Sequence, residues 1–282
     1  MLDVLASIIT TLLYAAILSC AGVVFAEATL HGSPDITRFS LRVMRRGAML
    51  TIAAALGSAV ILVYRLGGSF NGVTLNAVFL SISGAALCLQ LGGAFLLLTS
   101  FGDDQFARTI RLVNAGMAML SFAFHGHASG GDLGESGVAV IHLSAAAWWV
   151  GSLWLLYYSC SMEDLTNLVS LVLRFSAIAV RIVGVLLMAG VILAILLIST
   201  SAAPLTSPYV QILAIKVSMV AITMCLAIYN KFRLTPRLAR YDATAAGTLR
   251  AMIRNEMLLI TVVLLITAVL TTYTTPFVEY DV

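Results

Sequence analysis

Charged residues are scarce in this sequence: Asp, Glu, Lys and Arg make up only 10% of its 282 residues. Soluble domains carry about 25% charged and roughly 45–50% apolar residues. Here 61% of the residues are hydrophobic and the mean hydropathy is +1.03, so the polar surface of a water-soluble fold is missing. Proline is also rare, and the 21 glycines follow no period, which excludes collagen-like and linker sequences. An integral membrane protein is the class that remains.

The sequence also lacks cysteine motifs, nucleotide-binding loops and long basic runs. Its four cysteines stand singly, with no Cys-x-x-Cys pair, and we interpret them as small buried apolar residues. No Gly-x-x-x-x-Gly-Lys-Ser/Thr loop occurs, so ATP drive would need another subunit. A net charge of +3 is too small to predict nucleic acid as a partner. The composition predicts membrane lipid as the surroundings of this chain.

Uncharged apolar stretches predict an all-α, polytopic fold that forms a single transmembrane domain over residues 1–282. One spanning helix takes about 20 residues, and the chain has room for a bundle of about eight. We expect these helices at residues 4–26, 47–64, 73–100, 112–124, 137–160, 165–200, 208–230 and 252–273. The fourth is the shortest, and it reaches spanning length if Arg108 and Arg111 extend to the interface.

The positions of the basic residues predict the orientation. An even number of helices places both termini on one side, and cytoplasmic loops carry the excess of Lys and Arg. Thirteen of the 16 basic residues fall in the loops and helix ends of the other side. They are Arg38, Arg42, Arg45, Arg46, Arg108, Arg111, Arg174, Lys231, Arg233, Arg237, Arg240, Arg250 and Arg254. Both termini are therefore predicted to face outward, which is the periplasm if the cell is a Gram-negative bacterium.

Three of the four histidines lie close together in the sequence pattern. His125 and His127 end the fourth predicted helix, and His142 lies one to two turns into the fifth. Consecutive antiparallel helices are neighbours, so the three imidazoles can meet near the outer surface. Imidazole suits copper, zinc, iron and nickel, and copper heads the affinity order. The alternative is that the loop histidines are solvated and that His142 bonds a backbone carbonyl.

A second pattern would suit a path for a soft metal ion. Residues at three- to four-residue spacing share one face of the fourth helix, and thioethers select Cu(I). Asn114, Met117, Ser121 and His125 follow this spacing. Met119 and, on the sixth predicted helix, Met188 are further thioethers at membrane depth, and the candidate path residues are Asn114, Met117, Ser121, Met119 and Met188. The alternative is that these methionines fill gaps in the core, as methionine usually does.

Two basic residues, Arg181 and Lys216, lie inside predicted spans. Ionisable groups in the membrane are costly and are functional candidates by default. Their possible partners are Glu27, Asn230 and Glu256. A structural ion pair and a transport role for Lys216 and Glu256 both remain open.

At these residues the sequence resembles the copper-resistance D (CopD) family, mainly over residues 122–277. The first segment is Gly126-His127-Ala128 followed by His142-Leu143-Ser144-Ala145-Ala146-Ala147-Trp148-Trp149-Val150-Gly151-Ser152-Leu153. The second is Arg174-Phe175-Ser176, followed by Gly190 on the same helix. The third runs from Leu213-Ala214-Ile215-Lys216 to Asn230-Lys231-Phe232-Arg233-Leu234-Thr235-Pro236, with Glu256 opening the last helix. The family's histidine in the first helix is missing here.

The resemblance implies an inner-membrane protein that transports copper and serves copper uptake, homeostasis and resistance. It implies a copper ion as cargo, a periplasmic copper carrier of the copper-resistance C type as partner, and His127 and His142 as metal ligands. We therefore expect a transporter and not an enzyme. Two alternatives remain: a membrane b-type cytochrome with bis-His haem ligation, and a structural subunit whose histidines bind nothing.

Overall fold

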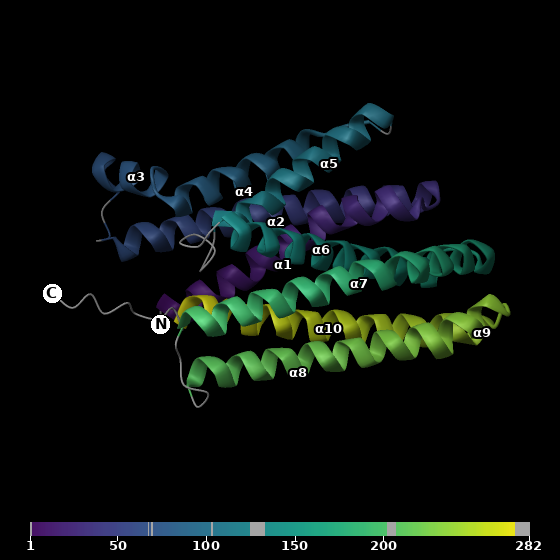
Figure 1. Ribbon diagram of the computed structural model, residues 1–282. Coiled ribbons are helices and arrows are strands. Elements are labelled where there is room, and N and C mark those ends of the chain that lie inside the picture. Colours follow the sequence, from purple (N-terminus) through teal and green to yellow (C-terminus); the bar gives the residue numbers. More distant parts are fainter. Residues whose placement is uncertain are drawn as a thin grey trace.

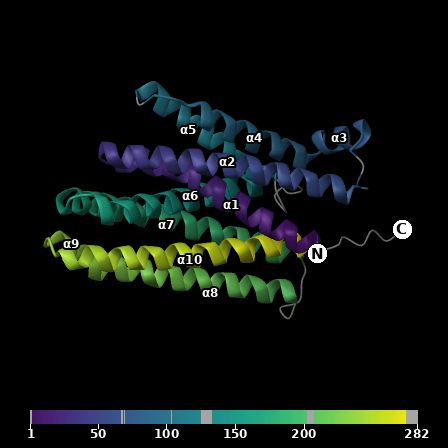
Figure 2. The same cartoon turned by 180° about the vertical axis from the view of Figure 1, so that it is seen from behind.

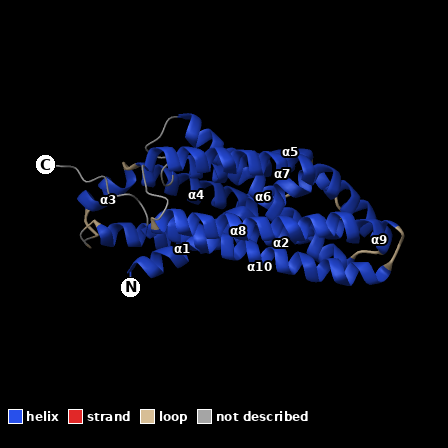
Figure 3. Ribbon diagram, turned by 60° about the horizontal axis from the view of Figure 1, so that its bottom comes forward, coloured by secondary structure: helices blue, strands red, loops and turns tan. Residues whose placement is uncertain are grey.

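The computed structural model describes residues 2–66, 68, 70–102, 104–124, 133–201 and 207–273, and all regular structure in these ranges is helical. The helices run side by side as an elongated bundle (Figure 1; Figure 3). In chain order they are α1 (Leu2–Leu30), α2 (Pro34–Arg65), α3 (Gly72–Phe79), α4 (Ile82–Thr99), α5 (Gln105–Leu120), the 3₁₀ turn η1 (Ser121–Phe124), α6 (Leu133–Met162), α7 (Leu165–Ser201), α8 (Pro208–Tyr229), the π-helical segment η3 (Asn230–Leu234), α9 (Thr235–Ala239) and α10 (Ala243–Tyr273). The predicted all-α class is confirmed.

Seven helices in the described part of the chain are long and apolar enough to cross a membrane. The seven are α1, α2, α4, α6, α7, α10 and the continuous stretch Pro208–Ala239, which joins α8, η3 and α9. The fourth predicted span corresponds to α5, which has 16 residues and is too short to count among them. The chain is thus a multi-pass membrane protein, and the number eight stays a prediction.

The prediction of one helix over residues 73–100 is wrong, because two helices, α3 and α4, occupy this stretch. Ser81 stands between them in an extended conformation, and its Oγ accepts a hydrogen bond from the backbone N–H of Gly84 at 3.0 Å. Such a serine cap satisfies an N–H group at the start of a helix. A Cβ atom on Gly84 would lie 2.2 Å from the carbonyl oxygen of Val78, so a glycine is needed at this break.

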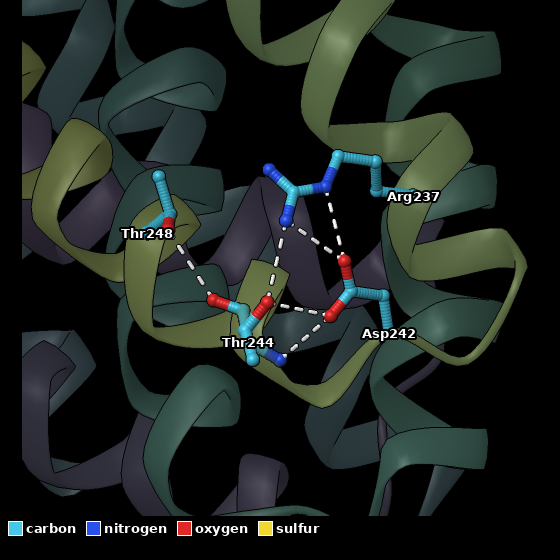
Figure 4. A network of polar contacts seen from close by, with 4 residues as sticks. All are labelled: Arg237, Asp242, Thr244 and Thr248. Carbon is cyan, nitrogen blue, oxygen red and sulfur yellow. Dashed lines mark hydrogen bonds and ion pairs between the residues drawn. The ribbon is translucent and has the colours of Figure 1, made fainter.

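The last helix starts nine residues earlier than the sequence predicted, at Ala243 instead of 252. A polar turn fixes this start (Figure 4). Asp242 forms an ion pair with Arg237 at 2.8 Å and accepts hydrogen bonds from the hydroxyl and the backbone N–H of Thr244. The hydrogen bonds from Thr244 and then from Arg237 hold the pKa of the Asp242 carboxyl below its ordinary value. The helix therefore begins before Arg250 and Arg254, which the sequence had placed in the loop and at the start of the predicted helix.

Most of the basic residues lie at one end of the bundle, where α2, α5 and α10 begin and where α9 lies (Figure 1). The first residue of α1 and the last of α10 lie at the opposite end, as Figure 2 shows from behind. Tyr14, near the middle of α1, and Thr271, near the end of α10, are joined by a side-chain hydrogen bond. The membrane side that each end faces stays a prediction.

Buried apolar side chains form two clusters, one centred on α1, α2, α4 and α5 and the other on α6, α7, α9 and α10. The backbones of α1 and α6 touch between them. A Cβ atom on Gly151 would lie 2.0 Å from the carbonyl oxygen of Gly22, and one on Gly22 would lie 2.0 Å from that of Ala147. Trp148 Nε1 donates a hydrogen bond to Thr29 Oγ1 at 2.8 Å across the same contact. This contact fixes α6, the helix that carries His142.

Candidate metal site and transport path

His142 projects from α6 onto α7 and is half-buried. Its Nδ1 lies 3.0 Å from the backbone carbonyl oxygen of Leu186. A carbonyl can only accept, so Nδ1 carries the hydrogen and Nε2 keeps a lone pair. Metal-binding histidines are usually oriented in this way, with the second ring nitrogen donating to a carbonyl or carboxylate. The sequence had offered a carbonyl bond as the alternative to metal binding, but this geometry is compatible with both.

Gly190 lets the imidazole reach this carbonyl. It lies four residues after Leu186, on the same face of α7. A Cβ atom at this position would be 3.0 Å from Cε1 and 3.3 Å from Nδ1 of His142, closer than ordinary contact. The absence of a side chain at residue 190 is therefore what leaves room for the ring.

Lys216 of α8 is half-buried and lies within electrostatic range of His142. The sequence marked both residues separately but did not place them together, because the contact joins helices far apart in the chain. An ammonium group near the imidazole opposes a second cation there, and the repulsion is strong where water is excluded. The charge of Lys216 therefore bears directly on any metal that His142 binds.

His125 and His127 lie outside the described residues. Within the described ranges, no three His, Cys, Asp or Glu side chains come together as a metal cluster. The turn η1, which leads toward His125, packs against α6, the helix that carries His142. The three-histidine site stays a prediction.

The candidate path residues of α5 and η1 belong to the other half of the bundle. Asn114 donates a hydrogen bond to Ser100 Oγ at 3.2 Å, and Ser121 donates to the carbonyl oxygen of Ala118 at 2.7 Å. Met119 is buried in the cluster around α1, and half-buried Met117 lies beside Gly92 of α4. These side chains pack on α1 and α4 or on their own helix, whereas His142 contacts α7.

Met188 faces outward from α7, with 62% of its surface exposed. Met188 comes two positions after Leu186, which places it about 200° further around the helix. It therefore lies on the face opposite to the one that meets His142. The structure does not bring Met188, Met117 and Met119 together on one side of His142.

A second polar group lies deeper in the same half of the bundle, between α6, η3 and α10. The amide of Asn230 donates to Glu256 Oε1 at 2.5 Å, and the two side chains are 8% and 2% exposed. The indole of Trp149 lies beside the same carboxyl group. Asn230 and Glu256 were expected as separate partners of Lys216 or Arg181; the structure pairs them with each other.

Residues 169–270 match the family model described as copper resistance protein D. No curated protein and no solved structure matches the chain. The matched segment begins in α7 and ends in α10, so it contains Leu186, Gly190, Lys216, Asn230 and Glu256. The resemblance seen in the sequence is confirmed over this segment, which contains the residues that meet His142.

Proposed function

We propose that this chain transports copper across the membrane. The proposal is supported by the match of a segment that spans α7 to α10 of this multi-pass inner-membrane protein to the copper resistance protein D family. The role of the chain would be copper uptake, homeostasis and resistance, not catalysis. The observation that carries the proposal is the position of His142, whose imidazole is held by a carbonyl of the matched helix α7 with Nε2 left to bind a metal.

In the mechanism that we propose, a periplasmic carrier of the copper-resistance C type delivers copper to His125, His127 and His142. The bond from His142 Nδ1 to Leu186 holds the ring, so copper binds Nε2 without a change of tautomer. The charge of Lys216 weakens the binding, and weak binding lets the ion leave again.

The test is copper retention and copper uptake by the purified protein. Wild type in detergent is incubated with copper and washed, and its metal is measured by plasma mass spectrometry; in proteoliposomes, uptake is followed with an internal indicator. His142→Asn should lose most of the bound copper and of the uptake. His31→Asn is the matched control, because His31 lies in the link between α1 and α2 with a φ of 48° that asparagine tolerates.

Three outcomes would contradict the proposal. Equal copper in wild type and His142→Asn would remove His142 from the site. Bound iron with a Soret band would indicate a b-type cytochrome instead. No metal in wild type, even when a loaded copper-resistance C type carrier is supplied, would indicate a structural protein.

A further inference from the structure

Glu256 is a buried acid without a cation beside it. Its side chain is 2% exposed, and it directly precedes the uncharged run of residues 257–273 in α10. Its hydrogen bond from Asn230 comes from a neutral amide. An ionised carboxylate removed from water costs several kcal/mol unless it is paired. The burial of Glu256 therefore calls for a bound proton or a bound cation.

The surrounding cations are directed elsewhere. At the basic end, Arg250 lies over the ring of Tyr157, Lys231 over that of Phe232, and Arg237 pairs with Asp242, while Arg233 and Arg254 are exposed. At the same end α1 contributes half-buried Glu27, and toward the other end α6 carries His142 and α8 carries Lys216. Among the described residues, none of these groups forms an ion pair with Glu256.

The amide of Asn230 and the indole of Trp149 are donors, which favour the carboxylate, so burial and an unsatisfied acceptor beside the acid are what favour a proton. Asn230 Oδ1 is buried and accepts no hydrogen bond within the described part of the chain. A protonated carboxyl has an O–H donor, which an ionised carboxylate lacks, so the acid form can satisfy a neighbouring acceptor. Copper is poorly matched to this group, because carboxylate and amide oxygens are hard ligands and Cu(I) prefers sulfur and imidazole.

We propose that Glu256 is a resident proton site of the transporter, protonated while His142 is free of metal and deprotonated when copper occupies His142. The Oε–H bond of Glu256 breaks as the copper–nitrogen bond forms, and the proton passes to solvent water, so one proton is released for each ion bound and no electron is transferred. His142 and Trp149 are seven residues apart on one face of α6, about 10 Å along the helix. A copper ion on His142 favours the ionised form of Glu256, which lies beside Trp149, because charges interact strongly where water is excluded.

The copper-dependent half of this proposal rests on the proposed function, whereas the resting proton does not. Infrared spectroscopy of the protein in lipid at neutral pH tests the proton alone. A protonated-carboxyl C=O band is expected in wild type and should be absent in Glu256→Gln. Asn230→Ala should shift its frequency, since the amide bonds the same carboxyl group. Glu163→Gln, directly after the end of α6 and away from Glu256, is the control and should leave the band unchanged. A wild type without this band would overturn the proposal.

The second measurement adds copper(I) under anaerobic conditions to the same samples. Most of the band should disappear in wild type and persist in His142→Asn. A band that stays at full strength while wild type binds copper at His142 would refute the exchange. If wild type binds no copper but shows the band, the proposed function fails and the resting proton stands. If Glu256→Gln does not fold, Glu256→Asp replaces it. A shifted frequency of the C=O band in Glu256→Asp would assign the band to residue 256 in the same way.

Discussion

Replacing Gly151 by alanine tests the backbone contact between α1 and α6. The added Cβ atom would lie 2.0 Å from both the carbonyl carbon and the oxygen of Gly22, and ordinary contact begins at 3.4 Å. The two helices must therefore separate by about 1.4 Å or more. Overpacking of a tight contact costs about 1–3 kcal/mol. At roughly 2–4 °C per kcal/mol, the melting temperature should fall by about 2–12 °C.

The assay is thermal unfolding in detergent, with Gly137→Ala as the control. Gly137 is also in α6, but a Cβ atom there meets nothing within 4 Å, so alanine should leave stability unchanged or raise it by about 0.5–1 kcal/mol. Gly22→Ala should behave like Gly151→Ala. The double variant should lose less than the sum, because the helices are already separated once the first methyl group is present. Equal melting temperatures for Gly151→Ala and Gly137→Ala would refute the contact.

Three further predictions concern the site and the loops. Gly190→Ala should push the His142 ring off the Leu186 carbonyl and weaken copper retention about 10–100-fold, whereas Gly184→Ala on the same helix, with open space around it, should not. Met119→Ala should destabilise the protein by about 2–5 kcal/mol, because Met119 is 1% exposed, while exposed Met188→Ala should change neither stability nor uptake; an uptake defect would restore Met188 to the path. Asp242, with its lowered pKa, should stabilise the α9–α10 turn above its ordinary pKa of 3.8 and lose this effect as the pH falls through the lowered value; hydrogen exchange of the Thr244 amide should show this in wild type but not in Asp242→Asn.

The sequence located most helices because uncharged apolar runs mark spans whatever packs around them. It missed the break at Ser81, where a single capping serine interrupts a stretch that is apolar on both sides. It also ended helices at charged residues, although α2 and α10 both continue through them. Composition therefore predicts which residues lie in the membrane, and local hydrogen bonds decide where each helix stops.

His142 could be chosen from the sequence because histidine is rare here and imidazole is a metal ligand. Its partner on α7 could not, since a backbone carbonyl has no sequence signal, and Gly190 was noted only as part of the resemblance. The proximity of Lys216 to His142 and the bond between Asn230 and Glu256 both depend on how distant helices pack. Such pairings require three-dimensional coordinates.

The stretch Pro208–Ala239 is one continuous helical segment that carries one residue from each of the two polar groups of the C-terminal half. Its 32 residues extend about 48 Å at 1.5 Å per residue. Lys216 stands on it near His142, and Asn230 stands where the helix widens into its π turn, about 21 Å further along. Widened turns of this kind are often found at functional positions. If a charge that arrives beside Lys216 shifts this helix, Asn230 moves with it. The hydrogen bond from Asn230 to Glu256 would then change as well.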